Sequence, residues 1–121
     1  MKKIEIFAPD DIEFDFSSLG LKSYFMPGDI PTKKVIKLLA LHKRYRKIES
    51  DEKEDEIIKE MTNHACSFFE DRHSKKELEE LKSKLGFSTL MQLITGINQT
   101  MVESGEDIKN LRNRAKKKAR K

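Results

Sequence analysis

The feature that most constrains the fold of this chain is an amphipathic stretch at residues 55–71, DEIIKEMTNHACSFFED. Its apolar residues recur at i, i+1, i+4, i+8, i+11 and i+12, and the 3.6-residue period of an α-helix gathers those positions on one face. Burying each of its two Phe side chains would contribute roughly 1.5–3 kcal/mol. We therefore expect this stripe to support the core, through Ile57, Ile58, Met61, Phe68 and Phe69.

The composition fits one domain with one small core. The chain has 121 residues, of which 38% are charged and 36% hydrophobic, and it has no Trp. A core made from Ile, Leu, Met and Phe in so charged a chain favours thin helical packing.

The first thirty residues predict two or three short strands. Apolar and polar residues alternate at 2–7 and again at 12–16, and 21–26 offers a third segment before Pro27 and Gly28. Alternation with period two suits a sheet with one buried face. Such a small antiparallel sheet must pack on helices, or pair with another molecule through a free edge.

Four helices are expected after this sheet. The first spans 31–48 with Pro31 in its first turn, and the second spans 51–71 and pairs antiparallel with it. The third follows a capping box at Ser74 and ends at a left-handed Gly86; the fourth begins after Ser88 as its N-cap and extends to 102. One side of the first helix is expected to hold Val35, Leu38, Leu39, His42, Tyr45 and Ile48.

The predicted fold class is therefore mainly α (α+β), with a small N-terminal antiparallel β element and a bundle of about four helices. Residues 1–30 are expected to form the β-rich arm or sheet, 31–104 the helical domain and 105–121 a basic tail.

The segment from 87 to 102 carries almost no charge, so the fourth helix is either the most buried or faces a partner. Exposed apolar stripes suit a protein that binds apolar helical clients, although such stripes usually form a domain's own core. The residues that we expect to contact a partner are Leu90, Met91, Ile94, Ile97 and Met101.

The positive charge is concentrated at the C-terminal end. Residues 105–121 hold eight Lys or Arg against two acids, so that the formal total of +4 leaves −2 for residues 1–104. Such a run attracts phosphate or an acidic surface, or is simply a solvated terminus. Its electrostatic residues are Arg112, Arg114, Lys116, Lys117, Lys118, Arg120 and Lys121.

No enzyme, metal or cofactor signature emerges. His64 and Cys66 lie two apart and would point ~200° away from each other on a helix, and with His73 they make only three nearby ligands of the kind that zinc prefers. Cys66 has no visible base or orienting group. One cysteine excludes an intramolecular disulfide, and no apolar run approaches the roughly 20 residues that cross a bilayer. We expect a cytosolic, non-catalytic protein that does not enter membranes.

The order of elements resembles a known family. The segments Met-Pro-Gly-Asp-Ile-Pro at 26–31, Glu-Ile-Ile-x-x-Met at 56–61, Glu-Leu-Glu-Glu-Leu at 77–81 and Leu-Met-Gln-Leu-Ile-x-x-Ile-Asn-Gln at 90–99 are similar to those of tail assembly chaperones of long-tailed bacteriophages with flexible tails. The resemblance covers about 26–102.

This resemblance implies a helical chaperone, a late viral protein in the host cell cytoplasm, which coats the tape measure protein and helps to recruit tail tube subunits. It also implies a longer form made by ribosomal frameshifting near the C-terminal end. A free strand edge near the N-terminus and the uncharged fourth helix would also allow a homo-oligomer. The alternative is a small nucleic-acid-binding or regulatory protein that uses the basic helix at 33–47 and the tail.

Overall fold

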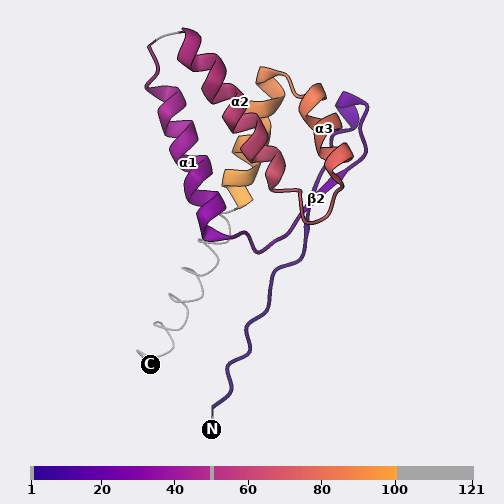
Figure 1. Cartoon of the computed structure of the whole chain (residues 1–121). Helices are drawn as coiled ribbons and strands as arrows, with labels where there is room; N and C mark the ends of the chain where they lie inside the picture. The colour runs from indigo at the N-terminus through magenta and orange to yellow at the C-terminus, as the bar shows by residue number, and fades with distance from the viewer. Residues whose placement is uncertain (1, 50, 101–121) are drawn as a thin grey trace, which may run out of the picture. The chain divides into compact units, whose positions relative to one another are not determined.

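The computed structural model describes residues 2–49 and 51–100, with only the backbone described at 51 and 52. It is mainly helical with a small two-stranded antiparallel sheet near the N-terminus, which confirms the predicted fold class (Figure 1). Contacts group the chain into two compact units, Met1–Leu85 and Gly86–Lys121. The two units are described separately below.

The sheet of the first unit pairs β1 (Ile12–Phe14) with β2 (Tyr24–Met26). Both strands are shorter than predicted. The carbonyl of Phe16 accepts from the N–H groups of Leu19 and Leu21 and so belongs to the turn that follows β1. That turn contains the short 3-10 helix η1 (Ser17–Leu19) and ends at Gly20, whose φ of 74° is in the left-handed region that glycine favours.

The predicted strand at 2–7 is wrong. No strand is present there, and the side chains of Ile4, Ile6 and Phe7 are 84%, 92% and 79% exposed. An alternating pattern forms a strand only when another strand pairs with it, and none of the described residues does so. The name N-terminal arm is used below for residues 2–7.

The first two helices, α1 (Thr32–Arg46) and α2 (Asp51–Ser67), form the predicted antiparallel pair (Figure 1). Ion pairs cross it, with Arg44 Nη1 3.4 Å from Glu60 Oε2 and Lys34 Nζ 2.5 Å from Glu70 Oε1. Basic residues of α1 therefore pair with one acid of α2 and one acid of the turns that follow it.

Two details of α1 differ from expectation. Pro31 is the N-cap, one position before the helix, and does not occupy its first turn. Leu38 and Leu41 are the buried leucines, whereas Leu39, which was expected inside, is 49% exposed. The buried face of α1 is therefore rotated toward Leu41.

The second helix ends at Ser67, four residues before the predicted end. The carbonyl of Ser67 accepts a hydrogen bond of 2.9 Å from Lys34 Nζ, and turns follow it. Phe68 and Phe69 lie in these turns and are 2% and 0% exposed. The Phe pair thus enters the core from beyond the helix.

The third helix, α3 (Lys75–Lys84), begins with the predicted capping box. Ser74 Oγ accepts from the N–H of Glu77 at 3.2 Å, and the Glu77 carboxylate accepts from the N–H of Ser74 at 3.0 Å. The predicted left-handed Gly86 is wrong, because the helix ends at Leu85 with φ −73° and ψ 115°, and Gly86 has no positive φ. An extended residue ends this helix instead of a glycine cap.

Aromatic rings form the centre of the first unit. The Phe69 ring lies edge to face with the rings of Phe14, Phe16 and Tyr24, at centroid distances of 5.3, 6.0 and 5.8 Å. Such pairs contribute about 0.5–1.5 kcal/mol beyond their buried area. Phe69 therefore joins the sheet to the end of α2.

Candidate binding surface

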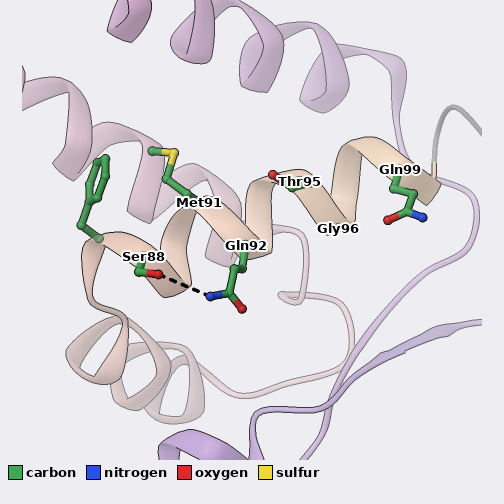
Figure 2. A pocket seen from close by; sticks show the side chains of 7 residues that line it. Ser88, Met91, Gln92, Thr95, Gly96 and Gln99 are labelled. Atoms are coloured by element: carbon green, nitrogen blue, oxygen red, sulfur yellow. Dashed lines mark hydrogen bonds between the residues drawn. The ribbon is translucent and has the colours of Figure 1, made fainter.

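The second unit is described as a helix from residue 87 to residue 100, and its start differs from the prediction. The carbonyl of Gly86 accepts the first helical bond from the N–H of Leu90 at 2.9 Å, and Thr89 Oγ1 accepts from the N–H of Gly86 at 2.8 Å. Gly86 is therefore the N-cap. Ser88, the predicted N-cap, lies inside the helix, where its Oγ accepts from Gln92 Nε2 at 3.4 Å (Figure 2).

One side of this helix is buried. Leu90, Leu93, Ile94 and Ile97 are at most 3% exposed. Three of these, Leu90, Ile94 and Ile97, belong to the set predicted to contact a partner. Of that set, Met91 retains partial exposure, and Met101 lies outside the described residues. A partner that binds this conformation would therefore reach Met91 but not the three buried side chains.

The other side of the helix holds a shallow groove of about 510 Å³, called the helix groove here (Figure 2). None of its lining residues is charged. Phe87 is 51% exposed at its N-terminal end. The lining residues are Phe87, Ser88, Met91, Gln92, Thr95, Gly96 and Gln99.

The helix groove combines an adaptable side chain, Met91, with a glycine, Gly96. Met91 is unbranched and fits varied surfaces. Gly96, in the helix interior, costs roughly 0.5–1 kcal/mol relative to Ala but leaves the backbone without a covering side chain. Thr95 and Gln92 add uncharged hydrogen-bonding groups. This chemistry suits an apolar or weakly polar helix.

Sequence reasoning missed most of the groove because it searched for large apolar residues. The signal was present in the spacing of Ser88, Gln92 and Gly96, at i, i+4 and i+8, with Met91, Thr95 and Gln99 beside them. Together these uncharged positions mark one helical face opposite the apolar stripe.

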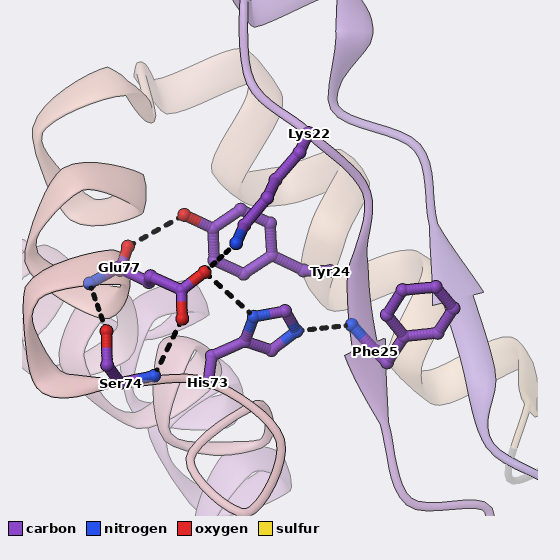
Figure 3. A network of polar contacts seen from close by, with 6 residues as sticks. All are labelled: Lys22, Tyr24, Phe25, His73, Ser74 and Glu77. Carbon is purple, nitrogen blue, oxygen red and sulfur yellow. Dashed lines mark hydrogen bonds and ion pairs between the residues drawn. The ribbon is translucent and has the colours of Figure 1, made fainter.

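A polar network in the first unit centres on Glu77 (Figure 3). Its Oε2 pairs with Lys22 Nζ and lies 3.5 Å from His73 Nδ1. These partners and the N–H of Ser74 lower the pKa of Glu77 to about 2, the hydrogen bond from Lys22 contributing most. The Tyr24 hydroxyl donates to the Glu77 carbonyl at 2.7 Å. Tyr24 belongs to β2 and Lys22 precedes it, whereas Glu77 lies in the first turn of α3. The network therefore joins the sheet to α3.

The two histidines considered for zinc each contact a backbone group of another segment. His64 Nε2 is 2.8 Å from the carbonyl oxygen of Lys34, and His73 Nε2 accepts from the N–H of Phe25. Burial raises the pKa of the Cys66 thiol to about 12. Within residues 2–49 and 51–100, no group of three or more His, Cys, Asp or Glu is arranged to hold a metal ion.

Of the two predicted basic regions, the helix at 33–47 lies within the described residues. Lys33, Lys37 and Lys43 are exposed on α1, whereas Lys34 and Arg44 form ion pairs with acids of the α2 region. The tail residues from Arg112 to Lys121 lie outside the described residues.

Ile57, Met61, Phe68 and Phe69 of the predicted core support are buried, and Ile58 is half-buried. In the part of the chain that the structure describes, no helix is both long and apolar enough to cross a membrane.

Comparison with known proteins yields no match to a family model, a curated protein or a solved structure.

Proposed function

We propose that this protein is a non-catalytic chaperone that binds a helical segment of a client protein in the helix groove. The observation that carries the proposal is the absence of charge from a groove of about 510 Å³ in a chain of which 38% is charged. An uncharged, partly apolar face avoids the cost of desolvating ions when a helix covers it.

The proposed client is the tape measure protein of a long-tailed bacteriophage, and the proposed second partner is the tail tube protein. The resemblance of residues 26–102 to tail assembly chaperones supports this identity, and that range includes every lining residue of the helix groove. The proposed setting is the cytoplasm of the infected host. A longer, frameshifted form belongs to the same proposal.

Recognition would follow the helix-in-groove mode. A client helix places side chains at i, i+3, i+4 and i+7 against the groove, and Met91 adapts to their shapes. Close approach at Gly96 favours small client side chains at the crossing point. Exposed Phe87 offers a larger apolar contact at the N-terminal end of the groove.

The test uses the full chain and the purified or co-expressed tape measure protein from the same phage. Met91→Asp and Thr95→Asp each place a carboxylate in the groove, and either should weaken binding about tenfold or more, which corresponds to about 1.4 kcal/mol. Ser83→Asp adds the same group at an exposed position of α3 and should leave binding unchanged.

Circular dichroism and thermal unfolding of each variant separate lost binding from lost folding. Full binding by both folded groove variants would reject the groove as the client site. Absence of binding by the unmodified chain would reject this client.

A second candidate function is nucleic-acid binding, favoured by the exposed cations on α1. Counterion release makes such binding strongly salt-dependent. If it operates, Lys33→Glu with Lys37→Glu should weaken binding to a DNA or RNA duplex and reduce its salt dependence, whereas Thr95→Asp should not. Binding that is insensitive to salt and to the Lys33 and Lys37 changes would reject this candidate.

A further inference from the structure

The N-terminal arm exposes three large apolar side chains, those of Ile4, Ile6 and Phe7. Ile4 and Ile6 are 84% and 92% exposed and lie two residues apart, so an extended backbone would place them on one side. The arm thus has the pattern of a half-buried strand without a strand to pair with.

Two contacts hold the base of the arm in line with β1. The Asp11 carboxylate accepts two hydrogen bonds from Arg72, at 2.8 Å from Nε and 3.2 Å from Nη2, and these lower the pKa of Asp11. A Cβ atom on Gly28 would overlap the carbonyl oxygen of Asp10 and lie 2.8 Å from Pro9 Cβ, so residues 9 and 10 pass directly over Gly28.

Because Gly28 follows β2, residues 9–11 continue the antiparallel path of β1, and the arm extends farther in that direction (Figure 1). Folding the arm back beside its own β1 would require the chain to reverse at residues 8–10, where Pro9 and Asp10 lie against Gly28. The fold therefore directs the arm away from its own sheet.

The outer edge of β1 offers backbone groups to a further strand. The N–H of Phe25 points away from β1, since it donates to His73 Nε2 at 2.8 Å. Glu13 lies opposite Phe25 in the register, so these two form the pair that exchanges no ladder bonds. The N–H and C=O of Glu13 consequently point outward, and no third strand among the described residues meets them.

The two faces of β1 carry side chains that are complementary to those of the arm. The side chains at 12, 14 and 16 are Ile, Phe and Phe, whereas those at 11, 13 and 15 are Asp, Glu and Asp. An antiparallel register that places Ile4 opposite Ile12 or Phe14 therefore puts Lys3 opposite Glu13 or Asp15. Glu5 would lie on the same face as Lys3 and carries the same charge as the acids of β1. The favourable charge pairing therefore comes from Lys3.

We propose that the N-terminal arm of one copy of this protein adds as a strand to the β1 edge of a second copy, and that the two copies exchange arms reciprocally. A twofold exchange uses the same arm and the same edge in both copies, which closes the assembly at a dimer. It also covers the exposed Ile4 and Ile6 and the open backbone at Glu13, a site that would otherwise invite uncontrolled pairing.

Sedimentation equilibrium of the full chain tests the proposal. The unmodified chain should form a dimer, and the combined change Ile4→Asp and Ile6→Asp should produce a monomer with an unchanged circular dichroism spectrum. Ile36→Asp, at an α1 position that is 60% exposed, is the matched control and should remain dimeric. A monomeric unmodified chain, or a dimer that survives the arm change, would overturn the proposal.

Disulfide trapping distinguishes exchange from folding back. In a Cys66→Ala background, a chain that carries both Lys3→Cys and Glu13→Cys should form covalent dimers on oxidation. Conversion to monomers with an internal disulfide alone would show that the arm pairs with its own β1, and would overturn arm exchange.

Discussion

The Nε2 atom of His73 accepts a hydrogen bond of 2.8 Å from the backbone N–H of Phe25, which ties β2 to the segment between α2 and α3. Because Nε2 accepts, the neutral ring carries its proton on Nδ1, which faces Glu77 Oε2 at 3.5 Å. The Tyr24 ring stacks on His73 at 4.5 Å between centroids. One histidine thus joins the sheet, the α2–α3 connection and the first turn of α3.

The first prediction concerns Glu77 and pH. Its pKa is about 2 in the folded protein against an ordinary value of 4.5, so it stabilises the fold above about pH 4.5, and that contribution is lost as the pH falls toward about 2. Glu77→Gln keeps a side chain that can reach the N–H of Ser74 but removes the charge that Lys22 and His73 face. In urea titrations, the variant should be less stable than the unmodified protein at pH 7, and the difference should shrink steadily below pH 5.

Glu56→Gln, at an exposed position on α2, controls for removal of a carboxylate from the surface. A difference between the Glu77→Gln variant and the unmodified protein that stays constant from pH 7 to pH 3 would contradict the assigned role of its charge.

The second prediction compares two phenylalanines. Phe69 is fully buried among Phe14, Phe16 and Tyr24, so Phe69→Ala should lower the free energy of unfolding by about 3–5 kcal/mol. Phe25 is 39% exposed, and Phe25→Ala should cost about 1 kcal/mol. Urea unfolding followed by circular dichroism measures both, and equal losses would contradict the placement of Phe69 at the core.

Local signals in the sequence were enough to predict the fold class, the helix pair and the capping box. Ser74 and Glu77 lie three residues apart and satisfy each other without help from the rest of the chain, which is why spacing alone located the start of α3. The predicted end of α2 failed for the opposite reason. Lys34, more than thirty residues away, binds the Ser67 carbonyl, and no local pattern reveals that contact.

The difference between local patterns and contacts that are distant in sequence also explains why the predictions for the arm and the groove failed. Alternation at 2–7 describes which side chains can share a face but does not supply a partner strand, so the pattern was visible and the strand was absent. At the fourth helix, the uncharged stretch was visible, but its apolar residues Leu90, Ile94 and Ile97 are buried, while Thr95 and Gly96 line the open side. Side-chain size therefore pointed to the face opposite the groove.

The third prediction concerns Cys66. It is fully buried, and burial raises the pKa of its thiol to about 12, so very little reactive thiolate exists at pH 8. The native protein should react with a disulfide reagent about a hundredfold or more slowly than a Ser83→Cys variant in a Cys66→Ala background, because position 83 is exposed. In denaturing urea the two thiols should react at similar rates. Similar rates in the native proteins would instead show that Cys66 is accessible.

The fourth prediction compares the same substitution at two glycines. In Gly28→Ser the added Cβ meets the backbone of Asp10, which a side-chain rotation cannot relieve, so the free energy of unfolding should fall by about 1–3 kcal/mol. In Gly86→Ser the nearest atom to the new Cβ is Thr89 Oγ1 at 3.9 Å, an ordinary contact, and serine is a favourable residue at the N-cap that Gly86 occupies. Urea unfolding should therefore show a loss for the first variant and no loss for the second. If Gly28→Ser were tolerated as well as Gly86→Ser, the segment at Pro9 and Asp10 would not lie over Gly28, and the arm would be free to fold back beside β1.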